Sequence, residues 1–561
     1  MTVAQYLLSR LTELGIRHLF GVPGDFNLWF LEEALNHSGI EFVGCCNELN
    51  ASYAADGYAR VSGIAAIATT YGVGELAAIA GIAGAFAEKL PVVCITGTPP
   101  LTAMEEHALI HHTLGDGNYE NMMNCYREFT VAQARLTATN AAHEIDRVLA
   151  ECLRQKRPVY LQLPSDIAGA EILERPTVPL PLIFPGDPQQ THRAAQELAQ
   201  LLNQAEKAAI LIDVDVDRFG LLPSVLKIAE TRNIPIAHVA TARGILSDSD
   251  PRNIGWYRGA ASAPEVKQAV EDADLLLCLG VRLTDVATGL FSHNLTKPRI
   301  VNIESSSTNI AGQQFLNVTA KELLDETLKQ LLPHKQQTAE RSPLSPTPDA
   351  SKLPDSALNQ EIFWTIIQSF IRPGDILISD TGTAGFASAG LRMPEDVRVL
   401  AQPIWGALGY GLPATLGACS ATDQRRVILF VGDGGLQMSV QELSTLLWRG
   451  LKPIIFLLNN DGYTIERLIY GPNSQYNNIA RWSYLRLPEV FEDGEPASTQ
   501  SVKTTNELME ALSSTQHQKA CHLIEVILPR MDALPSLVKF ARKAAEFDFP
   551  QLIESTAASR K

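Results

Sequence analysis

Short runs of apolar residues alternate with helical stretches along nearly the whole chain, and this alternation constrains the fold most. Each run is continuously apolar, which is typical of a strand that is buried on both faces. The runs cover residues 42–44, 65–69, 92–95, 159–163, 208–212, 275–277, 300–303, 376–379, 427–431, 454–458 and 523–528. Because such strands pair in parallel beneath two layers of helices, the pattern predicts an α/β fold in which each domain has a central parallel sheet flanked by helices.

Two proline-rich segments predict where the domains end. Residues 174–188 hold five prolines, and residues 333–356 are polar and rich in proline, so neither can continue a helix or a central strand. A chain of 561 residues suits three or four domains of roughly 150 residues each. We therefore expect a first domain at 1–180, a second at 190–335 and a third at 357–545.

The charge balance narrows the partners that we expect. Lys and Arg number 46 against 62 Asp and Glu, which gives a formal net charge of −16. An acidic chain of this kind does not favour a broad surface for nucleic acid or for an anionic membrane. We expect neither partner, although a local phosphate site is compatible with this composition.

The cysteines and the N-terminal residues favour a cytoplasmic protein. The eight cysteines include one close pair, Cys45 and Cys46, which has neither zinc-ligand spacing nor a geometry that favours a bridge between neighbours. Residues 1–15 lack the basic start and long apolar run of a signal peptide. The weakly polar stretch from Leu76 to Ala87 is too short to span a bilayer. The expectation is a cytoplasmic protein with reduced thiols.

Two motifs in the last third predict a metal site. VILFVGDGG and IIFLLNNDGYTIE place Asp433 and Asn460 directly after apolar strands, at the sheet edge where open α/β sheets bind ligands. The Asp433 carboxylate, the Asn460 amide oxygen and the Gly462 carbonyl are hard donors that suit Mg²⁺. Gly434 and Gly435 allow the backbone to approach a diphosphate. Each motif alone could be an ordinary turn between a strand and a helix, but the two together favour a metal–diphosphate site.

No good match to the glycine-rich fingerprint of dinucleotide-binding domains occurs, which disfavours a nicotinamide dehydrogenase. The spacing of GDG and NN instead resembles the motif of thiamine-diphosphate (ThDP) enzymes. The first third adds GVPGDFNLWFLE, GCCNELNASYAADGYAR, TYGVGELAAIAGIAGAFAE and HHTLGDG, which resemble the 2-keto acid decarboxylases, and indolepyruvate decarboxylase is the most similar of these. The resemblance implies ThDP and Mg²⁺ as cofactors, a pyrimidine-binding first domain and a diphosphate-binding third domain.

The resemblance also implies roles for five acid and imidazole side chains. Glu48 corresponds to the glutamate that hydrogen-bonds the pyrimidine ring of the cofactor. Asp25, His111, His112 and Glu466 correspond to groups that transfer protons and orient the substrate. Taken alone, Glu48 could be a helix cap or a surface charge, Asp25 a turn residue, and the histidine pair a packing or capping feature.

Three further residues match the cofactor-binding pattern of the family. Ile404 corresponds to the bulky side chain that wedges between the two rings of the cofactor. The carbonyl of Gln402 corresponds to the acceptor for its amino group, and Thr383 corresponds to a diphosphate contact. The alternative for Ile404 is an ordinary core residue.

Four residues are expected to line the substrate pocket: Thr381, Gly385, Phe386 and Ile465. Gly385 offers room for an aryl or long alkyl group, whereas Ile465 narrows the pocket slightly. The resemblance therefore implies a broad indolepyruvate- or phenylpyruvate-type decarboxylase, which releases CO₂ and an aldehyde. Thr381 departs from the family, because that group often has glutamine there.

Other functions compete with this hypothesis. One is a pyruvate decarboxylase, and another is a carboligating enzyme similar to acetohydroxyacid synthase, which Asp25 and the histidine pair disfavour. The third is a non-catalytic assembly protein of the same fold, which the complete set of acids and imidazoles disfavours. In the family the cofactor bridges two subunits, so the resemblance implies a homodimer at minimum, and family members are commonly homotetramers.

Overall fold

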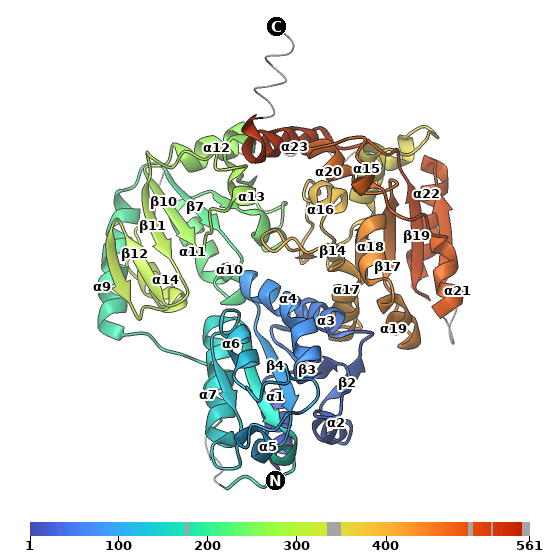
Figure 1. The fold of residues 1–561 in the computed structure, drawn as a ribbon. Coiled ribbons are helices and arrows are strands. Elements are labelled where there is room, and N and C mark those ends of the chain that lie inside the picture. Colours follow the sequence, from blue (N-terminus) through green and yellow to red (C-terminus); the bar gives the residue numbers. More distant parts are fainter. Residues whose placement is uncertain (174–178, 334–348, 492–496, 518–519, 552–561) are drawn as a thin grey trace.

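The computed structural model describes residues 1–173, 179–333, 349–491, 497–517 and 520–551. Within the two predicted linkers, residues 174–178 and 334–348 lie outside the described residues. The described residues form three β-sheets, each flanked by helices, and Figure 1 shows them as three lobes that meet around a central junction. The predicted α/β fold class is confirmed.

The first sheet is entirely parallel and has the order β2-β1-β3-β4-β6-β5. Its strands are β1 (His18–Gly21), β2 (Glu41–Gly44), β3 (Ala65–Thr70), β4 (Val92–Thr98), β5 (Gln133–Arg135) and β6 (Val159–Pro164). Its helices are α1 (Val3–Glu13), α2 (Leu28–Leu35), α3 (Glu48–Ser62), α4 (Val73–Ala87), α5 (Leu101–Glu105), α6 (Asn121–Arg127), α7 (Ala141–Gln155) and α8 (Ser165–Ala168). Side-chain caps start two of them: Thr2 and Gln5 form a capping box on α1, and Asn47 caps α3.

The second sheet is mostly parallel and has the order β13-β12-β11-β10-β7-β8-β9. Its strands are β7 (Ala208–Ile212), β8 (Ile236–His238), β9 (Asn253–Trp256), β10 (Leu275–Leu279), β11 (Arg299–Ile303), β12 (Ser307–Ile310) and β13 (Gln313–Leu316). Strands β12 and β13 are antiparallel, because the connections that precede them are too short for a crossover. The helices are α9 (Pro188–Gln204), α10 (Asp215–Arg218), α11 (Leu222–Arg232), α12 (Pro264–Glu271), α13 (Asp285–Thr288) and α14 (Ala320–Leu328).

The third sheet is parallel throughout, with the order β15-β14-β16-β17-β19-β18. Its strands are β14 (Ile376–Ser379), β15 (Arg398–Leu400), β16 (Val427–Gly432), β17 (Ile454–Asn459), β18 (Ser498–Val502) and β19 (His522–Ile527). Its helices are α15 (Gln360–Phe370), α16 (Thr383–Ser388), α17 (Gly411–Ala421), α18 (Asp433–Ser439), α19 (Glu442–Trp448), α20 (Thr464–Ile469), α21 (Leu487–Phe491), α22 (Thr505–Ser514) and α23 (Pro535–Asp548). Numbered within its own lobe, this sheet has the same strand order as the first.

The first and third lobes are held together by helices α3 and α17. A Cβ atom at Gly57 of α3 would lie 2.3 Å from the Ala414 carbonyl oxygen, and one at Gly417 of α17 would lie 1.8 Å from that of Ala54. Small residues therefore let the two helix backbones approach closely. The buried Asp56 carboxylate adds a hydrogen bond from the Tyr410 hydroxyl, at 2.7 Å.

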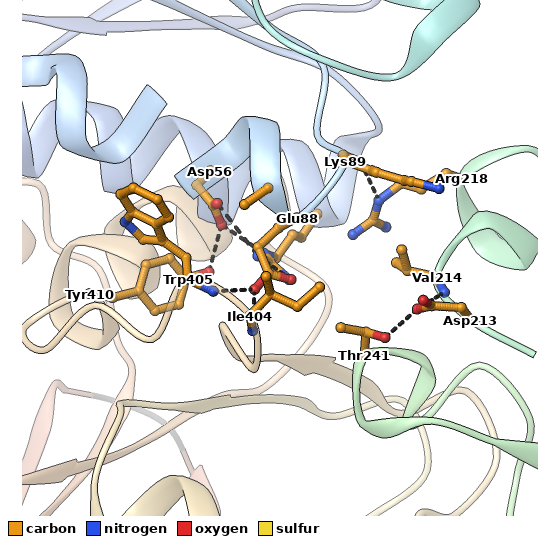
Figure 2. A network of polar contacts seen from close by, with 12 residues as sticks. Asp56, Glu88, Lys89, Asp213, Val214, Arg218, Thr241, Ile404, Trp405 and Tyr410 are labelled. Atoms are coloured by element: carbon orange, nitrogen blue, oxygen red, sulfur yellow. Dashed lines mark hydrogen bonds and ion pairs between the residues drawn. The ribbon is translucent and has the colours of Figure 1, made fainter. Parts of the chain in front are cut away.

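The second lobe docks on the first through an ion pair. The ammonium group of Lys89, just after α4, lies 2.7 Å from the carboxylate of Asp215 at the start of α10. Arg218 also donates a hydrogen bond to the Lys89 carbonyl oxygen, and Figure 2 shows Lys89 and Arg218 where the first and second lobes meet. Among the described residues, none of the helices has the length and hydropathy that a bilayer crossing requires.

Candidate active site

The structure brings the three predicted metal ligands to one edge of the third sheet. Asp433 and Asn460 follow the neighbouring strands β16 and β17, and both are buried. The Asp433 carboxylate accepts a hydrogen bond of 2.9 Å from the backbone N–H of Gly462. Gly462 has φ +112°, and a Cβ atom there would lie 2.3 Å from the Asn477 carbonyl oxygen, so the turn requires glycine.

The Asp433 carboxyl is buried without a paired cation. Burial raises the pKa of Asp433 to about 6, against the backbone N–H groups of Gly462 and Gly434, which lower it. In the described part of the chain, no basic side chain forms an ion pair with Asp433. A buried carboxylate, an amide side chain and a backbone carbonyl on neighbouring strand ends are hard oxygen donors, so the residues present fit Mg²⁺.

A cavity of about 310 Å³ opens beside Asp433. Its wall includes Asp461, Arg481, Trp482 and Tyr484, and Arg481 pairs with Asp461 at 3.1 Å. Asp433, one of the three predicted metal ligands, therefore lines a space that is large enough for a phosphate-containing group. The residues that sequence motifs identified account for only part of its wall.

Asp25, His111 and His112 form a second cluster, on the first lobe. The imidazole Nε2 of His111 lies 2.8 Å from one oxygen of Asp25, and that of His112 lies 3.9 Å from the other oxygen. The two imidazole rings are 4.6 Å apart, and the His111 ring stacks on Phe26. Asp25 and both histidines have side chains at least one third exposed, so the cluster faces outward.

Glu48 lies near this cluster, at the first position of α3. Its carboxylate is 3.0 Å from where a Cβ atom at Gly74 would lie, in the first turn of α4. One residue before α4, Gly72 packs against His112, since a Cβ atom there would lie 1.8 Å from the His112 carbonyl oxygen. The N-terminal turn of α4 therefore separates Glu48 from His112 by a few residues of tightly packed backbone.

The loop between β15 and α17 carries Gln402 and Ile404. The backbone N–H groups of Ile404 and Trp405 donate hydrogen bonds of 3.0 and 3.2 Å to the buried carboxylate of Glu88, at the end of α4 (Figure 2). Ile404 is only partly buried, unlike an ordinary core isoleucine. The Gln402 carbonyl accepts a hydrogen bond from the N–H of Gly406, and its side-chain amide is buried without a hydrogen-bond partner in the described structure.

The predicted pocket residues lie on α16, α20 and the turns before them. Thr383 begins α16 and is buried, whereas Thr381, Gly385, Phe386 and Ile465 are partly buried. A Cβ atom at Gly385 would lie 2.9 Å from the Asp380 carbonyl oxygen. Gly385 therefore permits close packing of α16 against the Asp380 backbone.

A helix that sequence patterns did not single out lies next to this pocket. The C-terminal helix α23 packs against α16 and α20, and its Phe540 ring lies 4.7 Å from the ring of Phe386. Figure 1 shows α23 beside α20. Only the amphipathic pattern of residues 535–548 could have indicated this helix, and that pattern says nothing about its place. Glu466 of α20 is exposed.

The two groups of predicted residues make no direct polar contact with each other in the described part of one chain. Among the described residues, no hydrogen bond or ion pair joins Glu48, Asp25 or either histidine of the pair to Asp433, Asn460 or Glu466. Within the described part of one chain, the Asp25–histidine cluster on the first lobe and the Asp433 turn on the third lobe therefore share no direct polar contact.

Known proteins match the chain along its length. Models of thiamine pyrophosphate enzymes match residues 1–118 (N-terminal TPP-binding domain), 195–331 (central domain) and 380–526 (C-terminal TPP-binding domain). The alpha-keto-acid decarboxylase of Mycolicibacterium paratuberculosis is 38% identical over 556 residues, which cover 98% of each chain. This chain belongs to the ThDP-dependent α-keto-acid decarboxylases. The Mycobacterium leprae protein of that name is 39% identical over 549 residues, which cover 97% of this chain and 96% of its own.

Membership of this family decides three of the expectations. The decarboxylase is an enzyme of the carboxy-lyase class, its cofactor is ThDP, and its substrate is a 2-keto acid. The motifs that carried the resemblance lie in the first and third lobes, in the two matched TPP-binding domains. The central domain also matches the family, although its sequence offered no specific motif.

Proposed function

We propose that this decarboxylase acts on an indolepyruvate- or phenylpyruvate-type 2-keto acid with broad specificity, and that it uses Mg²⁺ to hold ThDP. The single observation that carries the substrate proposal is the pair Phe386 and Phe540, whose partly buried rings lie 4.7 Å apart. Gly385, which precedes Phe386, adds no side chain next to the two rings. Two aromatic faces next to a glycine suit an aryl group better than a methyl group.

The chain's own residues would hold the cofactor from two sides. Asp433, Asn460 and Gly462 would bind Mg²⁺, Gly434, Gly435 and Thr383 would contact the diphosphate, Glu48 would hydrogen-bond the pyrimidine ring, and Gln402 and Ile404 would fix its orientation. ThDP supplies the electron sink that makes loss of CO₂ possible. The hydrogen bond between His111 and Asp25 orients the imidazole so that this cluster, with Glu466, can hold or donate a proton at the substrate.

A homodimer would complete the site, and a homotetramer is the proposed assembly. Support comes from the lack of any hydrogen bond or ion pair between the two groups in the described part of one chain, and from exposed apolar side chains beside both. Val73 and Leu76 flank the group on the first lobe, and Met438 of α18 flanks the group on the third, with exposures of 55, 39 and 52%. Apolar side chains gathered at both half-sites favour burial against a second copy.

A substrate panel tests the choice of 2-keto acid. Values of kcat/KM for indolepyruvate and phenylpyruvate should exceed that for pyruvate about tenfold or more, and Phe540→Ala should reduce the difference. Equal or better use of pyruvate by the unaltered enzyme would favour the pyruvate decarboxylase alternative. Formation of carboligation products by the enzyme would favour the acetohydroxyacid synthase-like alternative.

Mixing two inactive variants tests the shared site. In a heterodimer of Glu48→Gln and Asp433→Ala chains, one of the two sites would have both groups intact. Random mixing should restore about one quarter of the unaltered activity. Mixtures that stay inactive, although the chains exchange, would show that each chain builds its own site.

A further inference from the structure

Asp380 lies at the centre of the third lobe and has no role in the site described above. It follows β14 directly and is completely buried. It precedes the pocket residue Thr381 and lies three positions before Thr383. A carboxylate in this place, at the carboxyl end of a central strand, costs free energy unless something compensates it.

Backbone N–H groups at the end of the loop between β15 and α17, which carries Gln402 and Ile404, compensate part of this cost. The two carboxylate oxygens of Asp380 accept hydrogen bonds from the N–H groups of Gly409, at 3.1 Å, and Gly411, at 2.9 Å. These residues are the last part of the loop and the first residue of α17. The loop is therefore held at one end by Asp380 and further along by Glu88.

The same carboxylate lies against the diphosphate-side helix. A Cβ atom at Gly435 of α18 would lie 3.3 Å from the Asp380 carboxyl carbon. Helix α18 also reaches the loop itself, because the Ser439 hydroxyl donates a hydrogen bond of 2.7 Å to the Gly409 carbonyl. Asp380 thus contacts segments that were predicted separately to bind the two ends of the cofactor.

Comparison with Asp375, at the other end of the same strand, separates this role from ordinary stabilisation. Asp375 is also buried, but it forms an ion pair of 2.6 Å with Arg426. In the described residues no basic side chain pairs with Asp380, and burial raises its pKa to about 7. Only backbone N–H groups, including that of Thr381, lower the pKa of Asp380 against this shift. The Asp380 carboxylate therefore binds backbone N–H groups and no cation among the described residues.

We propose that Asp380 is a positioning residue that holds the Gln402–Ile404 loop, the start of α16 and the start of α18 in the register that binds ThDP. The inference rests on the proposed assignment of those segments to the cofactor. Asparagine at this position would present an N–H₂ group to one of the two glycine N–H groups, so one backbone donor would lose its acceptor. The three segments would then shift relative to one another.

Titration of the full-length apoenzyme with ThDP in Mg²⁺ buffer, followed by calorimetry, tests the proposal. Asp380→Asn should raise the Kd for ThDP about tenfold or more, the loss expected for one hydrogen bond to a charged group. The half-saturating ThDP concentration in the assay should rise in parallel, while the KM for the 2-keto acid stays within about twofold. Asp375→Asn, the matched control, should lower the melting temperature and leave the Kd for ThDP unchanged.

The possible results separate the proposed ThDP site from the proposed positioning role of Asp380. If the unaltered apoenzyme fails to bind ThDP, the proposed cofactor site is wrong. If it binds and Asp380→Asn binds equally well, the positioning role is overturned. Asp380→Ser, which is smaller and keeps one acceptor, provides a second variant. Failure of both variants to fold, with Asp375→Asn folded, would assign Asp380 to folding and also overturn the proposal.

Discussion

The carboxylate of Glu88 accepts the backbone N–H of Ile404 at 3.0 Å, although the two residues belong to different lobes. Glu88 is buried and also lies 3.9 Å from the guanidinium group of Arg60. The first lobe therefore determines where the predicted cofactor wedge on the third lobe of the same chain lies. A carboxylate distant in the sequence therefore holds this turn together with the loop's own hydrogen bond from Gly406 to Gln402.

Truncating Glu88 should release this loop. We expect Glu88→Ala to lower kcat about tenfold or more, because two backbone N–H groups lose a charged acceptor. Glu88→Gln keeps one acceptor oxygen, so its kcat should lie between that of the unaltered enzyme and that of Glu88→Ala. Glu271, a buried carboxylate of the second lobe that accepts a backbone N–H from Asn294, provides a control. Glu271→Ala should affect stability and spare kcat; equal losses of kcat in the two alanine variants would contradict a specific effect on the loop.

The effect of pH on cofactor binding should depend on Asp433. Its pKa is raised from the ordinary value of 3.8 to about 6, so the folded apoenzyme keeps a proton that the unfolded chain has lost. This stabilisation is fully present below pH 3.8 and is lost as the pH rises through about 6. Mg²⁺ would replace that proton. The rise in melting temperature on adding Mg²⁺ and ThDP should therefore be larger at about pH 7.5 than at about pH 5.5.

Asp433→Asn provides the comparison for this pH dependence. The variant should show a small rise in melting temperature at both pH values, because its side chain neither titrates nor attracts a cation. If the unaltered protein showed the same rise at both pH values, the metal assignment of Asp433 would fail.

The ion pair between Lys89 and Asp215 should stabilise the docking of the second lobe. Lys89→Met leaves the Asp215 carboxylate buried and unpaired, which should lower the free energy of unfolding by about 3–5 kcal/mol. The double variant with Asp215→Asn should recover part of this loss, as measured by urea unfolding. Strictly additive losses in the double variant would indicate that the two groups do not interact.

Gly462→Ala should damage the metal loop. Its left-handed φ and the nearby Asn477 carbonyl oxygen both oppose a side chain, so we expect a loss of about 3 kcal/mol or more and weaker Mg²⁺ binding. Gly450 also has a positive φ, but no atom lies within 4 Å of a Cβ atom there. Gly450→Ala should cost about 1 kcal/mol and leave Mg²⁺ binding unchanged. Thermal melting and metal titration of both variants measure the difference.

Sequence predicted most of the central strands because these are continuously apolar, and β7 and β14 have the predicted bounds, but it missed the interior strands β1, β8 and β12. It missed edge strands such as β5 and β18, whose residues are polar and whose pairing depends on a neighbour. The equal strand order of the first and third sheets also has no counterpart in the sequence, where no internal repeat is visible. Topology of this kind tolerates wide changes in side chains.

The residues of the candidate site also divide into those that local sequence predicts and those that only tertiary packing brings together. Asp433 and Asn460 could be predicted because a strand end and a short motif are both local features. The contact of Glu88 with Ile404 and that of Phe540 with Phe386 join residues distant in the chain, so they arise only from tertiary packing. Asp380 was visible as an acid after a strand, yet its glycine partners were not.

The interlocked backbones of α3 and α17 limit how this enzyme can move. Because Gly57 and Gly417 seat one helix against the carbonyl groups of the other, sliding or hinging between the first and third lobes would require steric overlap or an empty gap. We therefore expect substrate admission and aldehyde release to depend on the segments next to the predicted pocket residues, which are α23 and the turns that flank α16. Turnover is then expected to involve local motion of these peripheral segments while the first and third lobes keep a fixed arrangement.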